Sequence, residues 1–248
     1  MATQGRRPQR RPQKTTKPPQ QKRRPGQPKH ATKPPQAKKV VFDAAVAQND
    51  EPRTFRLGVV PGATPGKWID AWKLRMPHVA LEVVPVAVSD QDAAIDDLDA
   101  ALVRLPLGAD TLDALHVISL YDEVPVVVAS IESHLLAADD LHLADLAGEV
   151  LIALTDDTLP ALDAPGALAP RFAPLSTPDA IATAATGAGA VVVPMSLARL
   201  HHRKDADYRP LVDGPTSTVA LAWARERTTP DVETFVGIVR GRTAHSSR

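Results

Sequence analysis

The segment from Phe55 to Pro77 constrains the fold most, because it combines the signals of a strand, a tight turn and a helix. Its opening residues, Phe-Arg-Leu-Gly-Val-Val, form a short apolar run that predicts a buried strand. Gly62 marks a turn, and Thr64 followed by Pro65 is a typical helix start. The apolar residues that then recur at helical spacing are Trp68, Ile69, Trp72 and Met76.

The loop between this strand and this helix is a candidate binding site. Backbone N–H groups at a strand end and at a helix N-terminus favour an anion or a carbonyl oxygen. We therefore expect Gly62, Ala63 and Thr64 to contact a ligand. A plain helix cap is the alternative role for Thr64, and one hydroxyl can serve both purposes.

The rest of the chain alternates between predicted strands and helices. The further predicted strands are residues 79–88, 100–103, 115–120, 124–129, 150–154, 190–193 and 218–224. The predicted helices after the first begin at Ser89, Leu141, Thr177, Pro194 and Thr229. This alternation predicts an α/β fold with a mostly parallel sheet covered on both faces.

Charge is distributed unevenly along a chain whose formal net charge is zero. Residues 1–39 hold 13 of the 29 lysines and arginines and none of the 29 acids, so 16 cations face 29 acids in the remainder. The composition of residues 1–52 predicts a disordered basic tail and linker, and residues 242–248 are expected to be a disordered C-terminus. The segment from Arg6 to Lys39 predicts non-specific nucleic-acid binding or, alternatively, a merely solubilising extension.

Several classes of protein are disfavoured by composition. The sequence contains no cysteine, so disulfides and thiolate chemistry are excluded. No secretory signal and no apolar run of membrane-spanning length is evident, so we expect a cytoplasmic protein without a membrane partner. The run from His201 to Lys204 is expected to be a solvated helix end, and no metal site, cofactor or enzymatic arrangement is predicted.

Six segments, in this order, resemble the effector-binding (substrate-binding) domain of LysR-type transcriptional regulators. The resemblance extends from about Arg53 to Gly241. The segments are 55–60 (FRLGVV), 72–83 (WKLRMPHVALEV), 98–104 (LDAALVR), 121–129 (YDEVPVVVA), 143–148 (LADLAG) and 187–194 (GAGAVVVP). Residues 1–52 lack the apolar periodicity of the helix-turn-helix that such regulators carry.

The resemblance implies a two-lobed fold like that of type 2 periplasmic binding proteins, with two crossing strands. Lobe I would comprise residues 53–128 and 212–240, and lobe II residues 129–210. A small effector, often a carboxylate, would bind in the cleft and shift an open–closed equilibrium. The family also implies a homodimer, formed through the helix Thr64–Met76 and the helix that starts at Thr177.

Four further residues are expected at the cleft. Arg104 follows a predicted strand and would bind an effector carboxylate, with an ion pair to Asp99 or Asp110 as the alternative. By the resemblance, Thr155 would face the cleft, and Val193 and Pro194 would form an apolar wall.

The overall prediction is an effector-sensing protein that is not an enzyme. The alternatives are a nucleic-acid-associated protein whose domain is a dimeriser, and a transport binding protein, which the missing secretion signal disfavours.

Overall fold

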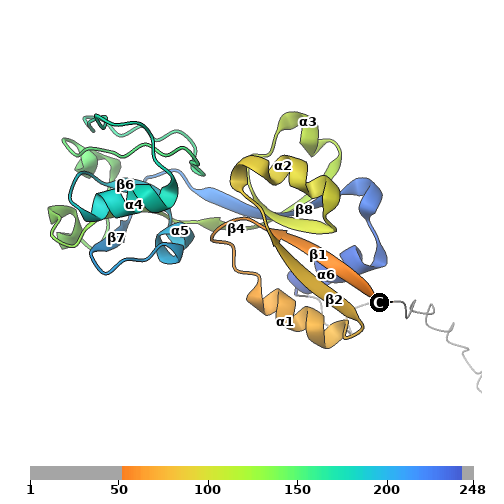
Figure 1. Ribbon diagram of the computed structural model, residues 1–248. Coiled ribbons are helices and arrows are strands. Elements are labelled where there is room, and N and C mark those ends of the chain that lie inside the picture. Colours follow the sequence, from red (N-terminus) through yellow and green to blue (C-terminus); the bar gives the residue numbers. More distant parts are fainter. Residues whose placement is uncertain (1–51, 242–248) are drawn as a thin grey trace, which may run out of the picture. The chain divides into compact units, whose positions relative to one another are not determined.

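The computed structural model describes residues 52–241, which form two sheets with helices packed against them (Figure 1). The predictions made for the basic tail, for a missing helix-turn-helix and for residues 242–248 lie outside the described residues. None of the helices in the described range is long and apolar enough to cross a bilayer.

The first lobe is built on a five-stranded sheet in the order β2-β1-β3-β8-β4. Its strands are β1 (Arg53–Val59), β2 (Val79–Pro85), β3 (Ala100–Arg104), β4 (Leu115–Glu123) and β8 (Ser217–Ala224). Strand β1 is parallel to β2 and β3, whereas β8 is antiparallel to both β3 and β4. This sheet is therefore mixed.

Helices α1 (Gly66–Arg75) and α6 (Pro230–Val239) pack on one face of this sheet. The rings of Phe55 and Trp72 lie 4.7 Å apart, and those of Phe55 and Phe235 lie 5.1 Å apart. The buried indole N–H of Trp72 donates to the Val79 carbonyl at 3.0 Å, so no polar atom of that ring is left without a partner. The short helices α2 (Gln91–Ala94) and α3 (Ala109–Leu112) belong to the same lobe.

The second lobe is built on a three-stranded antiparallel sheet in the order β6-β5-β7. Its strands are β5 (Pro125–Ser130), β6 (Val191–Pro194) and β7 (Ala206–Pro210). Helices α4 (Thr177–Ala185) and α5 (Met195–Leu200) share an apolar core with β5 and β6. The 3-10 helices η3 (His134–Ala137) and η4 (Leu143–Leu146) contribute to a second apolar cluster.

The α/β fold with two sheets is confirmed, but the mostly parallel sheet predicted from the alternation is wrong. Residues 150–154 form only isolated bridges, with Leu168, Ala190 and Leu175 as partners, because irregular segments replace a neighbouring strand there. Strand β5 already belongs to the three-stranded sheet, so the chain changes sheets at Val124, before the predicted lobe boundary at residue 128.

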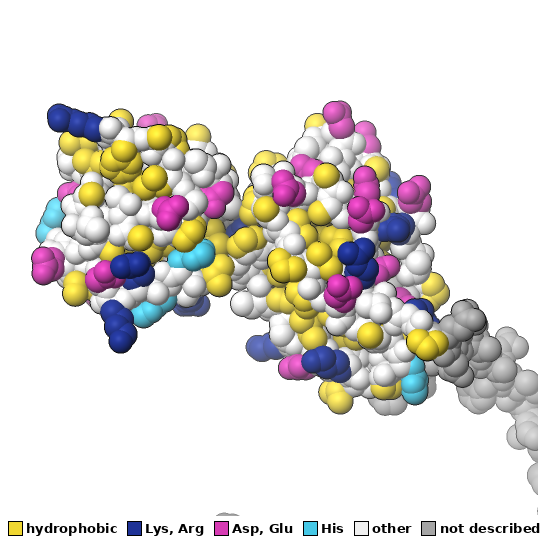
Figure 2. All heavy atoms as spheres, in the orientation of Figure 1, with side chains coloured by type: hydrophobic (Ala, Val, Ile, Leu, Met, Phe, Trp, Pro, Cys, Tyr) yellow, Lys and Arg dark blue, Asp and Glu magenta, His cyan; other side chains and the backbone are white. Residues whose placement is uncertain are grey.

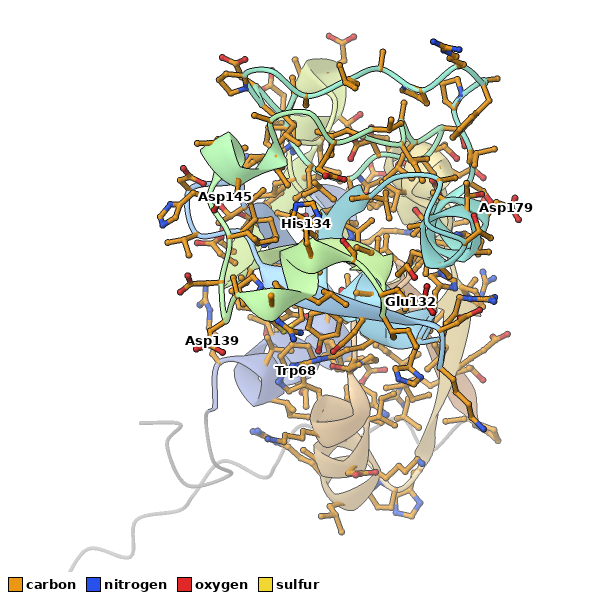
Figure 3. The ribbon with its side chains drawn as sticks, turned by 90° about the vertical axis from the view of Figure 1, so that its left-hand side faces the viewer. Trp68, Glu132, His134, Asp139, Asp145 and Asp179 are labelled. Atoms are coloured by element: carbon orange, nitrogen blue, oxygen red, sulfur yellow. The ribbon has the colours of Figure 1, made fainter. Side chains whose placement is uncertain are left out.

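Only some helix starts follow the predicted local chemistry. Ser89 caps no helix, because it lies within the 3-10 helix η1 (Val88–Asp90), and α2 begins only at Gln91 without a side-chain cap. Thr229 caps α6 as predicted, since its hydroxyl accepts from the Val232 N–H. The residue capping α4 is Ser176 instead of Thr177, and its hydroxyl donates to the Asp179 carboxylate at 2.6 Å; Asp179 lies at the start of that helix (Figure 3). Thr64 makes no cap bond, because α1 begins only at Gly66.

Candidate ligand site at the junction of the lobes

A cavity of about 570 Å³ opens where the two lobes meet. The first lobe contributes the loop residues Gly62, Ala63 and Thr64 and the end of β4. The second lobe contributes residues from α5, and Val124 lies between the lobes. The volume falls within the range of small-molecule sites, and a ligand inside would touch both lobes at once.

The loop that was expected to contact a ligand does line this cavity. Gly62 has a φ of 84°, a backbone conformation that favours glycine. A Cβ atom at this position would lie 2.4 Å from Ser196 Oγ and 3.0 Å from Arg104 Nη2. Only glycine therefore allows the loop of the first lobe to approach α5 of the second lobe so closely.

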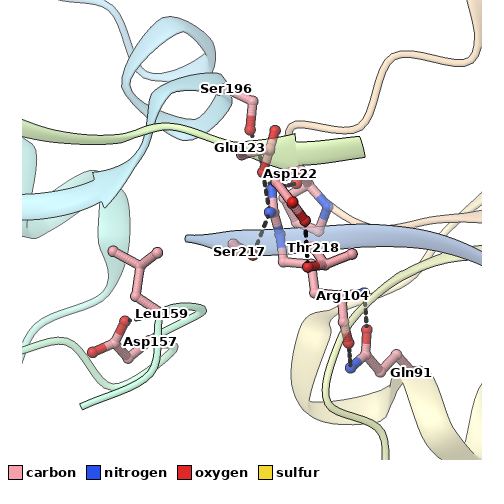
Figure 4. Close-up of polar contacts among 10 residues, drawn as sticks. Gln91, Arg104, Asp122, Glu123, Asp157, Leu159, Ser196, Ser217 and Thr218 are labelled. Atoms are coloured by element: carbon pink, nitrogen blue, oxygen red, sulfur yellow. Dashed lines mark hydrogen bonds and ion pairs between the residues drawn. The ribbon is translucent and has the colours of Figure 1, made fainter. Parts of the chain in front are cut away.

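Arg104 lies behind the cavity wall and is only 2% exposed. Its guanidinium pairs with the Glu123 carboxylate, so neither Asp99 nor Asp110 is its ion-pair partner (Figure 4). It also donates to Ser217 Oγ at 3.1 Å, to Ser196 Oγ at 3.2 Å and to the Pro61 carbonyl at 3.0 Å.

Through these contacts, the Arg104 side chain connects β4, β8, the β1–α1 loop and α5. Because Glu123 already balances its charge, Arg104 serves as a support for the site in this structure.

The other predicted residues are not brought to this cavity. Thr155 is exposed and donates from its hydroxyl to the Leu175 carbonyl at 3.3 Å. Val193 is buried in the core beneath α4 and α5, and Pro194 is the buried residue that precedes α5. The residues that follow Pro194, rather than Pro194 itself, reach the cavity.

Most of the lining was not identified from the sequence. The residues missed are Tyr121, Asp122, Glu123, Val124, Met195, Ser196, Arg199 and Leu200. One usable signal was the helix start at Pro194, because residues four apart in a helix, such as Met195 and Arg199 or Ser196 and Leu200, lie on the same face. The other was the acidic pair Asp122 and Glu123, which ends β4 one residue before the strongly apolar strand β5 begins.

The polar groups of the cavity carry both signs of charge. The Asp122 carboxylate accepts a bond from Thr218 Oγ1 at 2.6 Å, and Arg199 Nε donates to the Tyr208 hydroxyl at 3.1 Å. Burial raises the pKa of Tyr121, and the neighbouring Glu123 carboxylate raises it further, while Arg104 opposes both effects. Tyr121 therefore presents a neutral hydroxyl at physiological pH.

Within residues 52–241, no group of three or more His, Asp or Glu side chains is arranged to hold a metal ion. The cavity instead offers hydroxyl groups, one guanidinium, the apolar side chains of Val124, Met195 and Leu200, and two carboxylates, of which that of Glu123 is paired with Arg104. Such a set suits reversible binding of a small organic molecule.

Solved structures share this fold. The BenM effector binding domain with its effector benzoate is 19% identical, with a TM-score of 0.61 over 77% of this chain and 95% of that chain. The reduced OxyR regulatory domain from Pseudomonas aeruginosa is 18% identical, with a TM-score of 0.56 over 77% of this chain and 96% of that chain.

Comparison with the curated proteins gives no match. The family description that matches the sequence is the LysR substrate binding domain, over residues 48–244. That match covers well over half of the 248 residues and includes every strand and helix described above. The chain therefore belongs to the family of LysR substrate-binding domains.

Proposed function

We propose that this protein senses a small organic anion, which binds in the cavity between the lobes. The observation that carries this proposal is that a single cavity takes its lining from the β1–α1 loop, the end of β4 and α5. A ligand held by both lobes stabilises the closed arrangement more than an open one, and this difference shifts the equilibrium between them.

The preference for an anion rests on two features of the wall. The lining residue Thr64 lies shortly before the N-terminus of α1, which no side chain caps, and the positive end of the helix dipole favours a negatively charged group near Thr64. Arg199 adds a guanidinium from the other lobe. The similarity to a structure that contains benzoate is consistent with this class of ligand.

Thermal denaturation with a library of small carboxylates tests the proposal. A ligand should raise the melting temperature of the wild type and of Ile131→Trp, but not of Leu200→Trp. Leu200 is 55% exposed and lines the cavity, whereas Ile131 is 57% exposed and lies outside the lining. A ligand that stabilises both variants equally would place binding elsewhere and contradict the proposal.

The proposed role is binding without catalysis, in the cytoplasm, by a homodimer that uses α1 and α4. Leu74 on α1 and Thr183 on α4 are suitable probes, because neither lines the cavity. If the dimer exists, Leu74→Glu or Thr183→Glu should lower the mass measured by light scattering. A wild-type mass of one chain would refute it.

A second function, nucleic-acid binding, is favoured by the cations of the segment from Arg6 to Lys39. Acidic side chains gather over α3 and its surroundings on the face seen in Figure 2, so that surface would repel a polyanion. Any binding should therefore disappear when residues 1–39 are deleted, with the ligand response unchanged. Absence of binding by the full chain would exclude this function.

A further inference from the structure

The charges around the cavity favour a carboxylate ligand that also carries a positive charge, and this inference rests on the proposed function, the binding of a small carboxylate-bearing molecule in that cavity. We propose that the ligand is zwitterionic, an amino acid or a close analogue, with its ammonium group at Asp122 and its carboxylate at Arg199. Both residues line the cavity, one from β4 and the other from α5.

The buried ion pair of Arg104 and Glu123 adds no net charge to the cavity. Glu123 and Arg104 are 7% and 2% exposed, and each is the other's partner. Recruiting either one for a ligand would leave the opposite charge buried without compensation, which is strongly unfavourable. The charged groups that remain for a ligand are therefore Asp122 and Arg199.

The Asp122 and Arg199 side chains are both exposed, and each has polar atoms that are free to make a further hydrogen bond. Thr218 Oγ1 binds Oδ1 of Asp122, and Oδ2 has no partner among the described residues. Arg199 uses Nε to bind the Tyr208 hydroxyl, which leaves its two terminal nitrogen groups without a partner in the same part of the chain. A guanidinium binds a carboxylate through such paired N–H groups, and a carboxylate oxygen accepts readily from an ammonium.

A ligand with only one charge would fit less well. A simple carboxylate at Arg199 would leave Asp122 as an uncompensated like charge in the same cavity, which disfavours binding. A simple amine at Asp122 would likewise leave the positive charge of Arg199 uncompensated in the cavity. The apolar side chains of Val124, Met195 and Leu200 provide room for an apolar side chain on the ligand.

Matched sets of compounds test this inference in the full-length protein. The standard L-amino acids are first screened by thermal denaturation, and calorimetry then compares each binder with its des-amino acid and its decarboxylated amine. For leucine these are 4-methylpentanoate and 3-methylbutylamine. We expect at least one amino acid to bind about tenfold or more tightly than both of its partners.

Charge-neutralising variants assign the two ends of the ligand. Asp122→Asn should weaken the amino acid about tenfold while the des-amino acid binds as well as before or better. Arg199→Gln should weaken both of these compounds and spare the amine. The controls Asp113→Asn and Arg171→Gln change exposed residues outside the lining and should alter nothing.

Two results would overturn the inference. One is a des-amino acid that binds the wild type as tightly as its amino acid, and the other is an Asp122→Asn variant that keeps the wild-type preference. If the binding of such a des-amino acid is lost in Leu200→Trp but not in Ile131→Trp, the proposed function stands and only the zwitterion fails. If no amino acid binds, the inference also fails, and the carboxylate library then decides the proposed function separately.

Discussion

Arg104 and Glu123 form a buried ion pair directly behind the β1–α1 loop, joining the end of β3 to the end of β4 (Figure 4). The Arg104 guanidinium also bonds to Ser196 in the second lobe. One side chain thus supports the cavity floor and links the two lobes, so we expect changes to it to affect stability and ligand response together.

Removing one member of this pair should be costly. Glu123→Leu or Arg104→Met would leave the opposite charge buried without its partner, and we expect the free energy of unfolding to fall by about 3–5 kcal/mol. Chemical denaturation measures this loss. The double variant Arg104→Met, Glu123→Leu should recover much of it, and a double variant as unstable as the sum of the singles would contradict the ion-pair explanation.

Ser196→Ala should remove the hydrogen bond between the lobes. One such bond contributes roughly 0.5–1.5 kcal/mol, so we expect a stability loss of that size together with an altered ligand affinity. Ser217→Ala removes a bond to the same guanidinium from within the first lobe and provides the comparison. If both variants changed affinity equally, a special role for the contact across the lobes would be refuted.

Gly62→Ala should destabilise the protein by about 1–3 kcal/mol, because it forces a side chain into a positive φ and into contact with Ser196. Gly66→Ala is the matched control at the start of α1, where an added Cβ meets no atom within 4 Å. That control should be neutral or stabilising by less than about 1 kcal/mol. Equal losses in the two variants would argue against the close approach of the loop to α5.

Tyr121 should ionise at a higher pH than a free tyrosine, because burial and Glu123 raise its pKa. The chain has two tyrosines, so the ultraviolet titration of Tyr208→Phe reports Tyr121 alone. The folded state retains this proton above about pH 10, where the unfolded chain releases it, so ionisation should lower stability as the pH rises further. A midpoint at or below that of free tyrosine would contradict the environment described for this residue.

Much of the fold could be predicted from local patterns in the sequence. The strand, turn and helix from Phe55 onward follow from apolar spacing and turn residues, and Thr229 signals the start of α6. Strand β7 was missed because its sequence, Ala-Asp-Tyr-Arg-Pro, lacks an apolar pattern and is held by pairing with β5. Its formation depends on tertiary contacts that composition does not reveal.

The candidate site was predicted only in part for a similar reason. The β1–α1 loop was found because its turn chemistry is local. The environment of Arg104 depends on Glu123, Ser196 and Ser217, which are distant in sequence, and no spacing rule relates them. The cavity residues of α5 were missed because the family resemblance indicates Pro194, whereas the residues after it line the cavity.

Strand β8 lies between β3 and β4, although it is the last strand along residues 52–241. During synthesis, β1 to β4 leave the ribosome long before the strand that joins two of them, and the entire second lobe emerges in between. A nascent chain that ends before Ser217 therefore exposes the unsatisfied edges of β3 and β4, which makes truncated products prone to aggregation and to removal by proteases. The sheet that carries one side of the cavity can be completed only after the other side has been made.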